Sequence, residues 1–477
     1  MQRKFLLNLI LLIAINLLIK PLAIFGIDAQ VQNRVGYEDY GIYFSLFNFT
    51  YLFNILLDLG ITNFNIKNVA QFPILSKRYI GKLISLRILL FLVYVVLILT
   101  VGFAIGFRGE RITILSFLIV NQFLLSSILF FRSYFSGMLK FALDAFFSVF
   151  DKLLLIFICG YYLYIDQSAT FSIYHFIFSQ TFAYVISIVA ILLLLSKKVG
   201  FQSFKVRPNF SIAIFKKALP YALLTLAMTA YTRIDAVLLE RIHPNGALET
   251  GIYAQAYRIL DAFVMFTFLF NTLLFPIFSA LHAKKEDIRS LLMTASKLLF
   301  TLALAVVLGS IFFAEDILSL FYSELDETSV RVFQLLIISF LPISAIQVFG
   351  TLHTASGNLR FLNVLSLIGF LVSVGLNIFL IPEFGAVGTA VTCIVTHLVI
   401  AVAQIVYAKM YFHLKTAWKM IISLVAYGIL LSGTLYLFTF SDWNFGSKII
   451  VFGVVSVVSS ILFRLIDVRE MKKFLQR

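Results

Sequence analysis

The sequence predicts an all-α protein that crosses a membrane many times, and three observations carry this prediction. Hydrophobic residues make up 61% of the 477 residues and charged residues only 13%, whereas soluble domains carry about 25% charged residues. The hydrophobic residues form runs long enough to span a bilayer, which takes about 20 residues of helix. Basic and acidic residues alternate between successive connections. This composition excludes an ordinary water-soluble enzyme, a disordered chain and a disulfide scaffold.

Fourteen apolar runs, taken in chain order, are the candidate transmembrane helices. The first follows Arg3 and Lys4 as a signal peptide would, but it continues past Lys20 with no cleavage site, so we interpret it as a retained helix. The others are separated by short polar or turn-forming connections. The runs cover residues 5–27, 40–64, 80–106, 113–138, 145–165, 171–196, 214–240, 251–281, 290–314, 330–353, 361–381, 385–408, 417–440 and 446–466.

The charges of the connections predict the orientation of the chain. The N-terminus, the even-numbered connections and the C-terminus hold most of the 38 Lys and Arg residues, and the odd-numbered connections hold most of the 23 acids. Because cytoplasmic connections carry the excess of Lys and Arg, we predict fourteen helices with both termini in the cytoplasm. Topology and contact with anionic lipid headgroups account for the net charge of +15, so no nucleic acid partner is expected.

A short motif recurs at the entrances of the second and eighth predicted helices. Residues 40–43 read Tyr-Gly-Ile-Tyr, and residues 250–253 read Thr-Gly-Ile-Tyr. The recurrence favours two six-helix bundles related by pseudo-symmetry. The predicted domains are an N-lobe of helices 1–6 (1–200), a C-lobe of helices 7–12 (214–411), and helices 13–14 with a cytoplasmic tail (417–477); the loop 197–213 links the lobes.

Five ionisable residues lie well inside the outer halves of predicted helices: Lys20, Arg233, Asp235, Arg258 and Asp261. A charge at bilayer depth costs at least about 2.5 kcal/mol and normally faces a bundle interior or a watery cavity. Arg258 and Asp261 share a helix face because they are spaced i and i+3. The five carry a surplus of one positive charge, which favours an anionic ligand. We therefore predict a substrate-binding site, with interhelical salt bridges that fix the packing as the alternative.

Other charges within predicted helices lie near the cytoplasmic ends. They are interpreted as side chains that snorkel to the interface or form salt bridges there. This group comprises Asp58, Arg87, Arg132, Asp151, Lys152 and Lys297.

Several stretches occur together in a recognisable order: residues 36–43 and 57–61, residues 233–235 and 251–258, and residues 355–358 and 377–390. In this order the chain resembles the polysaccharide-transport flippases of the multidrug/oligosaccharidyl-lipid/polysaccharide exporter superfamily. The resemblance spans almost the whole chain.

The resemblance implies a flippase of the bacterial inner membrane. Such a protein moves undecaprenyl-diphosphate-linked oligosaccharide from the cytoplasmic to the periplasmic leaflet, for polysaccharide or O-antigen (lipopolysaccharide) assembly, by alternating access between two lobes. By helix and depth, Lys20, Arg258 and Arg233 correspond to a cationic cavity that holds the diphosphate. Asp235 and Asp261 depart from that pattern. The implied partners are the lipid-linked glycan, membrane lipids and polysaccharide polymerase machinery.

Two rival functions remain open at this point. A cation-coupled multidrug or metabolite exporter of the same superfamily would need a membrane-embedded acid, and Asp235 or Asp261 would serve. A membrane enzyme acting on the same lipid-linked substrate would need a sizeable outer loop, but the longest one, residues 315–329, is short and acidic. The six His residues are scattered, and no nucleophile motif or glycine-rich phosphate loop is present, so neither catalysis, a metal site nor a cofactor is expected.

Overall fold

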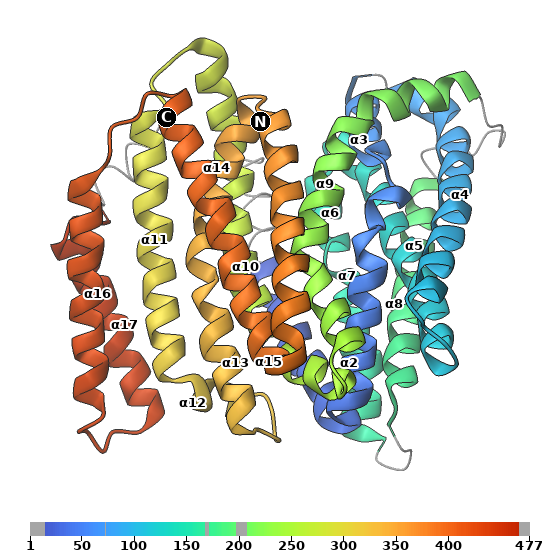
Figure 1. Cartoon of the computed structure of the whole chain (residues 1–477). Helices are drawn as coiled ribbons and strands as arrows, with labels where there is room; N and C mark the ends of the chain where they lie inside the picture. The colour runs from blue at the N-terminus through green and yellow to red at the C-terminus, as the bar shows by residue number, and fades with distance from the viewer. Residues whose placement is uncertain (1–14, 72, 167–170, 197–207, 467–477) are drawn as a thin grey trace. The chain divides into compact units, whose positions relative to one another are not determined.

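A computed structural model describes residues 15–71, 73–166, 171–196 and 208–466, and every regular element in these ranges is a helix (Figure 1). Nine of the described helices are long and apolar enough to cross a membrane. The predicted class, an all-α polytopic membrane protein, is confirmed. The number of fourteen spans and the cytoplasmic termini stay predictions. The start of the first predicted span, most of the loop 197–213 and the C-terminal tail after residue 466 lie outside the described residues.

The chain forms two compact units, which are Met1–Ala254 with Ser373–Thr389 (unit 1) and Gln255–Val372 with Ala390–Arg477 (unit 2). Both boundaries fall inside long helices, α10 (Gly246–Lys284) and α15 (Leu359–Tyr411). The predicted lobes divide instead at the loop 197–213. The predicted lobes are the two bodies expected to move against each other, and their boundary at this loop stays a prediction.

Unit 1 begins with helical residues 15–23 and continues through eleven named elements. They are η1 (Ile24–Asp28), α2 (Ala29–Leu52), η2 (Asn54–Leu57), α3 (Ile61–Gln71), α4 (Pro73–Ala104), α5 (Glu110–Gly137), α6 (Phe141–Phe147), α7 (Phe150–Gly160), η3 (Tyr161–Ile165), α8 (Ile173–Ser196) and α9 (Pro208–Ile242). Unit 2 contains α11 (Arg289–Phe312), α12 (Ala314–Ser319), α13 (Glu327–Ile338), α14 (Phe340–Ala355), α16 (Trp418–Phe438) and α17 (Phe445–Leu462).

The second predicted helix, 40–64, is wrong as a single span. The α-helix α2 ends at Leu52, and α3 begins at Ile61 after the 3-10 turn η2. Leu59 and Gly60 have φ values of 43° and 79°, which end a right-handed helix. Asp58 then caps α3, because its carboxylate accepts the backbone N–H of Thr62 at 3.2 Å. Hydropathy alone does not show this break, because the flanking residues are apolar on both sides.

Two further glycines bend helices that would otherwise be continuous. Gly36 inside α2 has φ 84° and ψ 176°, so the chain turns within the first predicted outer connection. Gly385 inside α15 has φ 50° and ψ −128°, and it separates the eleventh and twelfth predicted spans. A side chain strongly disfavours both conformations, which glycine adopts freely.

The core of unit 1 is built around α5, which packs along α3 and α8 (Figure 1). This core contains several buried aromatic residues, among them Phe130, Tyr134, Phe135 and Phe147. Ring pairs such as Phe135 and Phe147, stacked 5.6 Å apart, interlock the helices. In the described part of unit 2, smaller cores lie where α11 packs on α14 and where α11 packs on α16.

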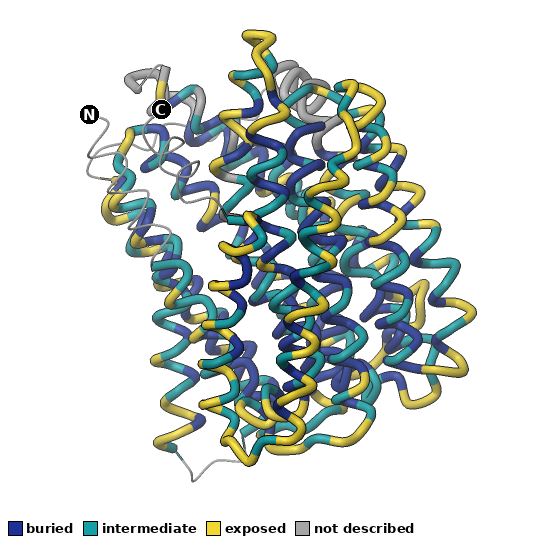
Figure 2. Tube along the Cα trace, turned by 90° about the vertical axis from the view of Figure 1, so that its left-hand side faces the viewer, coloured by how far each residue is buried: buried dark blue, intermediate teal, exposed yellow. Residues whose placement is uncertain are grey.

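Buried and exposed residues alternate along single helices, as the colouring in Figure 2 shows. Many of the exposed residues are large and apolar, for example Ile429 at 68% and Ile450 at 67% in α16 and α17. In water such a surface would be unstable, but against lipid tails it is the preferred one. The exposed apolar faces are therefore the lipid-facing surfaces of a membrane protein.

Candidate functional site

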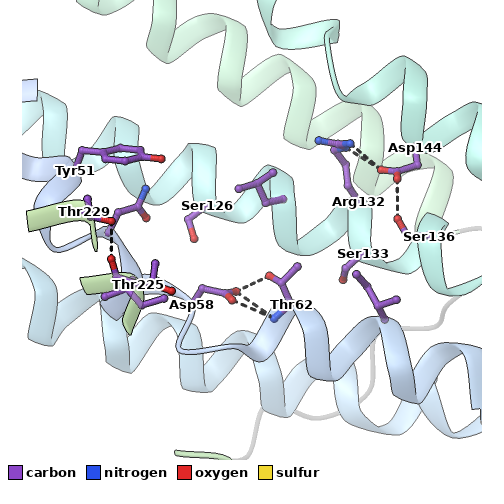
Figure 3. Close-up of a pocket in the computed structure, with 14 residues that line it drawn as sticks. Tyr51, Asp58, Thr62, Ser126, Arg132, Ser133, Ser136, Asp144, Thr225 and Thr229 are labelled. Atoms are coloured by element: carbon purple, nitrogen blue, oxygen red, sulfur yellow. Dashed lines mark hydrogen bonds and ion pairs between the residues drawn. The ribbon is translucent and has the colours of Figure 1, made fainter. Parts of the chain in front are cut away.

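A polar pocket of about 390 Å³ opens inside unit 1 (Figure 3). Its walls come from the end of α2, the break before α3, the middle of α5, the start of α6, and α9. Half of its lining residues are serine, threonine or asparagine, and the charged lining residues are Asp58, Arg132 and Asp144. A hydroxyl-rich cavity at membrane depth is unusual, because polar groups there are costly unless they meet water, a partner or a ligand.

Asp58 is held at the pocket by Arg87 from α4. The Arg87 guanidinium, only 2% exposed, donates to Asp58 Oδ1 at 2.8 Å and to Ser126 Oγ at 2.7 Å. It also lies over the ring of Phe130, 4.8 Å from the centroid. Its charge is therefore matched within unit 1, and the side chains that it fixes form one wall of the pocket.

A second ion pair also lines the pocket. Arg132 on α5 contacts Asp144 Oδ1 through both Nε and Nη2 at 2.9 Å, and Ser136 Oγ donates to Asp144 Oδ2 at 2.7 Å (Figure 3). On α7, Lys152 pairs with Asp151 at 3.1 Å. The salt-bridge interpretation of Arg87, Arg132 and Lys152 is confirmed.

Lys20 lies beside these pairs. Among the described residues, Lys152, Arg132 and Asp151 are close enough for their charges to act on it. Within the part of the chain that the structure describes, no carboxylate lies within ion-pair distance of Lys20, whereas Arg132 and Lys152 each have an aspartate. This group of side chains therefore has a surplus of one positive charge, which belongs to Lys20.

Arg233 on α9 lies close to the same pocket. Its Nη1 donates to Asn48 Oδ1 at 3.4 Å, and its guanidinium lies 5.4 Å from the centroid of the Tyr51 ring. Tyr51 itself lines the pocket. Of the five predicted site residues, Lys20 and Arg233 thus lie around the hydrophilic interior of unit 1.

Asp235, two residues further along α9, is 2% exposed and belongs to a different cluster. Its Oδ1 accepts hydrogen bonds from Ser373 Oγ and Asn377 Nδ2, both at 2.7 Å. Neither donor carries a charge, and Asn377 Oδ1 is buried with no hydrogen-bond partner among the described groups. A carboxylate and an unused amide oxygen, both buried, form an environment suited to a proton or a small cation.

Arg258 and Asp261 lie on α10 in unit 2, and both are half-buried. They share one helix face, as their spacing predicts. Among the residues that the structure describes, no group of three or more His, Cys, Asp or Glu side chains is arranged to hold a metal ion.

Sequence reasoning did not select Arg132 and Lys152 as part of a site with Lys20. Both were assigned to the membrane interface because of their positions near helix ends. Depth along one helix is a one-dimensional measure, and it does not show that α5, α7 and the first helix converge. Gly137, the last residue of α5, was the available signal that this helix ends there; the chain then turns at Leu139, with φ 57°, and brings Asp144 to Arg132.

The comparisons with known proteins concern the family and the fold. Residues 5–282, more than half of the chain, match the family described as polysaccharide biosynthesis protein. Residues 220–379 match the MatE family. A search of the curated proteins gave no significant match.

Solved structures show the same fold at low sequence identity. The lipid II flippase MurJ in an inward closed conformation is 14% identical, with a TM-score of 0.74 over 95% of this chain and 99% of that one. An inward-facing multidrug resistance MATE transporter is 15% identical, with a TM-score of 0.67 over 84% and 98%. A transporter from Pyrococcus furiosus Vc1 gives a TM-score of 0.57 at 15% identity, over 85% and 94%. At these identities the likeness shows the fold alone.

These folds are those of transporters and flippases, and the predicted superfamily resemblance is confirmed. The exposed apolar helices, the family match and the shared fold make this chain a multi-pass membrane protein. It belongs to the polysaccharide biosynthesis protein family and has the fold of the multidrug/oligosaccharidyl-lipid/polysaccharide (MOP) transporter superfamily.

Proposed function

We propose that the protein is a flippase that moves undecaprenyl-diphosphate-linked oligosaccharide from the cytoplasmic to the periplasmic leaflet of a bacterial inner membrane. The observation that carries the proposal is the surplus positive charge of Lys20 beside the ion pairs of Arg132 and Lys152. A diphosphate carries the opposite charge, and its oxygens accept hydrogen bonds from ammonium and guanidinium groups. The match to the polysaccharide biosynthesis family gives independent support.

The polar pocket suits the sugar part of the same molecule. Hydroxyl and amide side chains both donate and accept hydrogen bonds, as sugar hydroxyls do, and pockets of a few hundred Å³ are typical of small-ligand sites. In this proposal Lys20, Arg233 and Arg258 contact the diphosphate during alternating access, and the polyprenyl tail stays in the lipid. Asp235 and Asp261 contact the glycan or a coupling ion. Polysaccharide or O-antigen polymerase machinery takes up the delivered unit.

The test is movement of a lipid-linked oligosaccharide between leaflets in proteoliposomes. Removal of the Lys20 charge deprives the diphosphate of a charged hydrogen bond, worth about 1.5–3 kcal/mol. We therefore expect Lys20→Ala to reduce the rate at subsaturating substrate by roughly 10- to 150-fold, and Lys20→Arg to restore most of it. The matched control is Lys409→Ala, which removes an exposed charge at the end of α15.

Two results would contradict the proposal. Equal rates for wild type and Lys20→Ala would remove Lys20 from the site. No movement of any lipid-linked sugar by a folded protein would remove the flippase function itself.

A second candidate is a cation-coupled multidrug or metabolite exporter, and the environment of Asp235 favours it. A buried carboxylate whose donors among the described residues, Ser373 and Asn377, are both neutral suits the binding of a cation or a proton. The match of residues 220–379 to the MatE family points the same way. Efflux of a small organic cation that follows a sodium or proton gradient, without movement of lipid-linked sugar, would decide for the exporter.

A further inference from the structure

A second polar cavity, of about 640 Å³, lies in unit 1 and shares no lining residue with the pocket described above. It is formed by the turn after α4, the start of α5, the end of α9 and the start of α10. These segments belong to connections that the charge pattern predicts to be periplasmic. Its ionisable lining residues are Glu38, Arg108, Arg111, Glu240, Arg241 and His243.

Two of the arginines are held in place by the turn after α4. Arg108 Nη1 donates to the backbone carbonyls of Phe103 at 2.8 Å and Phe107 at 2.7 Å. The guanidinium of Arg241 lies over the Phe107 ring, 5.2 Å from its centroid. Because these side chains are already ordered, a ligand that binds them loses less conformational entropy.

The charges of the cavity do not balance. Glu240, with a side chain that is 1% exposed, faces Arg111 at 2.8 Å and Arg241 at 3.6 Å. One carboxylate thus compensates two guanidinium groups. Arg108 adds a third positive charge, and Glu38, which is exposed, adds the second negative one. The lining keeps a surplus of one positive charge around a common cavity, and this surplus favours an anionic ligand.

A histidine adds a further donor. The backbone N–H of Asn245 donates to His243 Nδ1 at 3.2 Å, so the neutral ring carries its proton on Nε2 and can donate from there. Asp39 lies near Glu38 and Glu110, but neither Asp39 nor Glu110 lines the cavity. Neither acid therefore fills the place of an anion in it.

We propose that this cavity is an oxyanion-binding site. The planar guanidinium fork fits the oxygens of a phosphate or a carboxylate better than it fits a halide. The ligand is an anionic group presented at the outer side of the membrane, either the phosphate of a lipid or the carboxylate of an acidic sugar. This site goes beyond the proposed flippase function, because it requires no movement of lipid.

The experiment uses the purified full-length protein in detergent, with inorganic pyrophosphate and glucuronate as probes and sodium chloride at equal ionic strength as the reference. The readout is the dependence of the unfolding midpoint on probe concentration, which gives an apparent Kd. We expect at least one probe to raise the midpoint. Arg108→Gln should raise the apparent Kd for that probe by about tenfold or more. A second variant, Arg241→Gln, should do the same.

The matched control is Arg34→Gln. Arg34 is another exposed arginine of the predicted outer side, and it donates to the carbonyl of Leu163 at 3.2 Å, but it does not line the cavity. Its variant should bind the probe as the wild type does. A response to pyrophosphate alone assigns the site to phosphate, and a response to glucuronate assigns it to acidic sugars.

No response to either probe, or equal responses in Arg108→Gln and wild type, would overturn the proposal. Neither result would affect the flippase proposal, because binding is measured here without transport. Conversely, if the protein moved no lipid in proteoliposomes, the result of the binding experiment would still hold.

Discussion

The role of Asp235 depends on the side chains around it as well as on its position in the sequence. The sequence places an acid within a membrane helix. The structure adds that both its described donors, Ser373 and Asn377, are neutral. A buried negative charge without a cationic partner is costly, so the cluster is expected to take up a proton or a small cation during the transport cycle.

This gives a prediction for Asp235→Asn. The asparagine Oδ1 can still accept from Ser373 and Asn377, so the protein should fold and its unfolding midpoint should change little. Transport should lose its dependence on a sodium or proton gradient, because the group that holds the ion is gone. Transport in proteoliposomes with and without an imposed gradient measures this.

The control for that experiment is Asp316→Asn, which changes an exposed acid on α12. It should behave as the wild type. If Asp235→Asn keeps the full response to the gradient, Asp235 is a structural residue.

At the scale of single elements, the most restrictive contact joins α2 and α10 within unit 1. A methyl group at Gly41 would overlap the carbonyl oxygen of Ala247 and lie 2.8 Å from the backbone nitrogen of Gly251. A methyl group at Gly251 would in turn overlap the backbone of Tyr37. Gln32 Nε2 strengthens the contact by donating to the Gly251 carbonyl at 2.8 Å. The two glycines of the recurring Gly-Ile-Tyr motif therefore allow two helix backbones to touch.

We expect Gly41→Ala to destabilise the protein by about 1–3 kcal/mol or more, because backbone atoms cannot move aside as a flexible side chain does. The measurement is the unfolding midpoint in detergent. The matched control is Gly375→Ala on α15, since a methyl group there meets no atom within 4 Å. The control should be neutral or stabilising by up to about 1 kcal/mol, because alanine favours helix. Equal midpoints for both variants would show that the close contact is not part of the dominant conformation.

For the molecule as a whole, the orientation in the membrane is the prediction with the widest consequences. Single cysteines in a Cys159→Ser, Cys393→Ser background provide the test, since both native cysteines are buried. A cysteine at Ser323 should react with an impermeant maleimide added outside cells, whereas one at Lys285 should react only after the membrane is opened. Lys285 lies just before α11, which is long enough to span the membrane, and Ser323 follows the short helix α12 beyond its other end. The reverse pattern would invert the predicted topology, and with it the outer location of the oxyanion cavity.

The sequence alone determined the class of the protein, its many membrane-spanning helices and its superfamily. Apolar run length is a property of the chain read in one dimension, and the bilayer selects for it in the same way at every helix. The positions of Lys20, Arg233 and Asp235 inside the membrane followed from the same reasoning, since a charge within an apolar run is visible in the sequence.

Only the tertiary structure decided what those charges face. It divided the second predicted span at Asp58, and it brought Lys20 beside Arg132 and Lys152 from two other helices. It also gave Asp235 two neutral donors from a distant segment. The physical reason is that the energy of a charge depends on its neighbours within a few ångströms. In a helical membrane protein those neighbours come from helices far apart in the chain, so their identity appears only when the helices are packed.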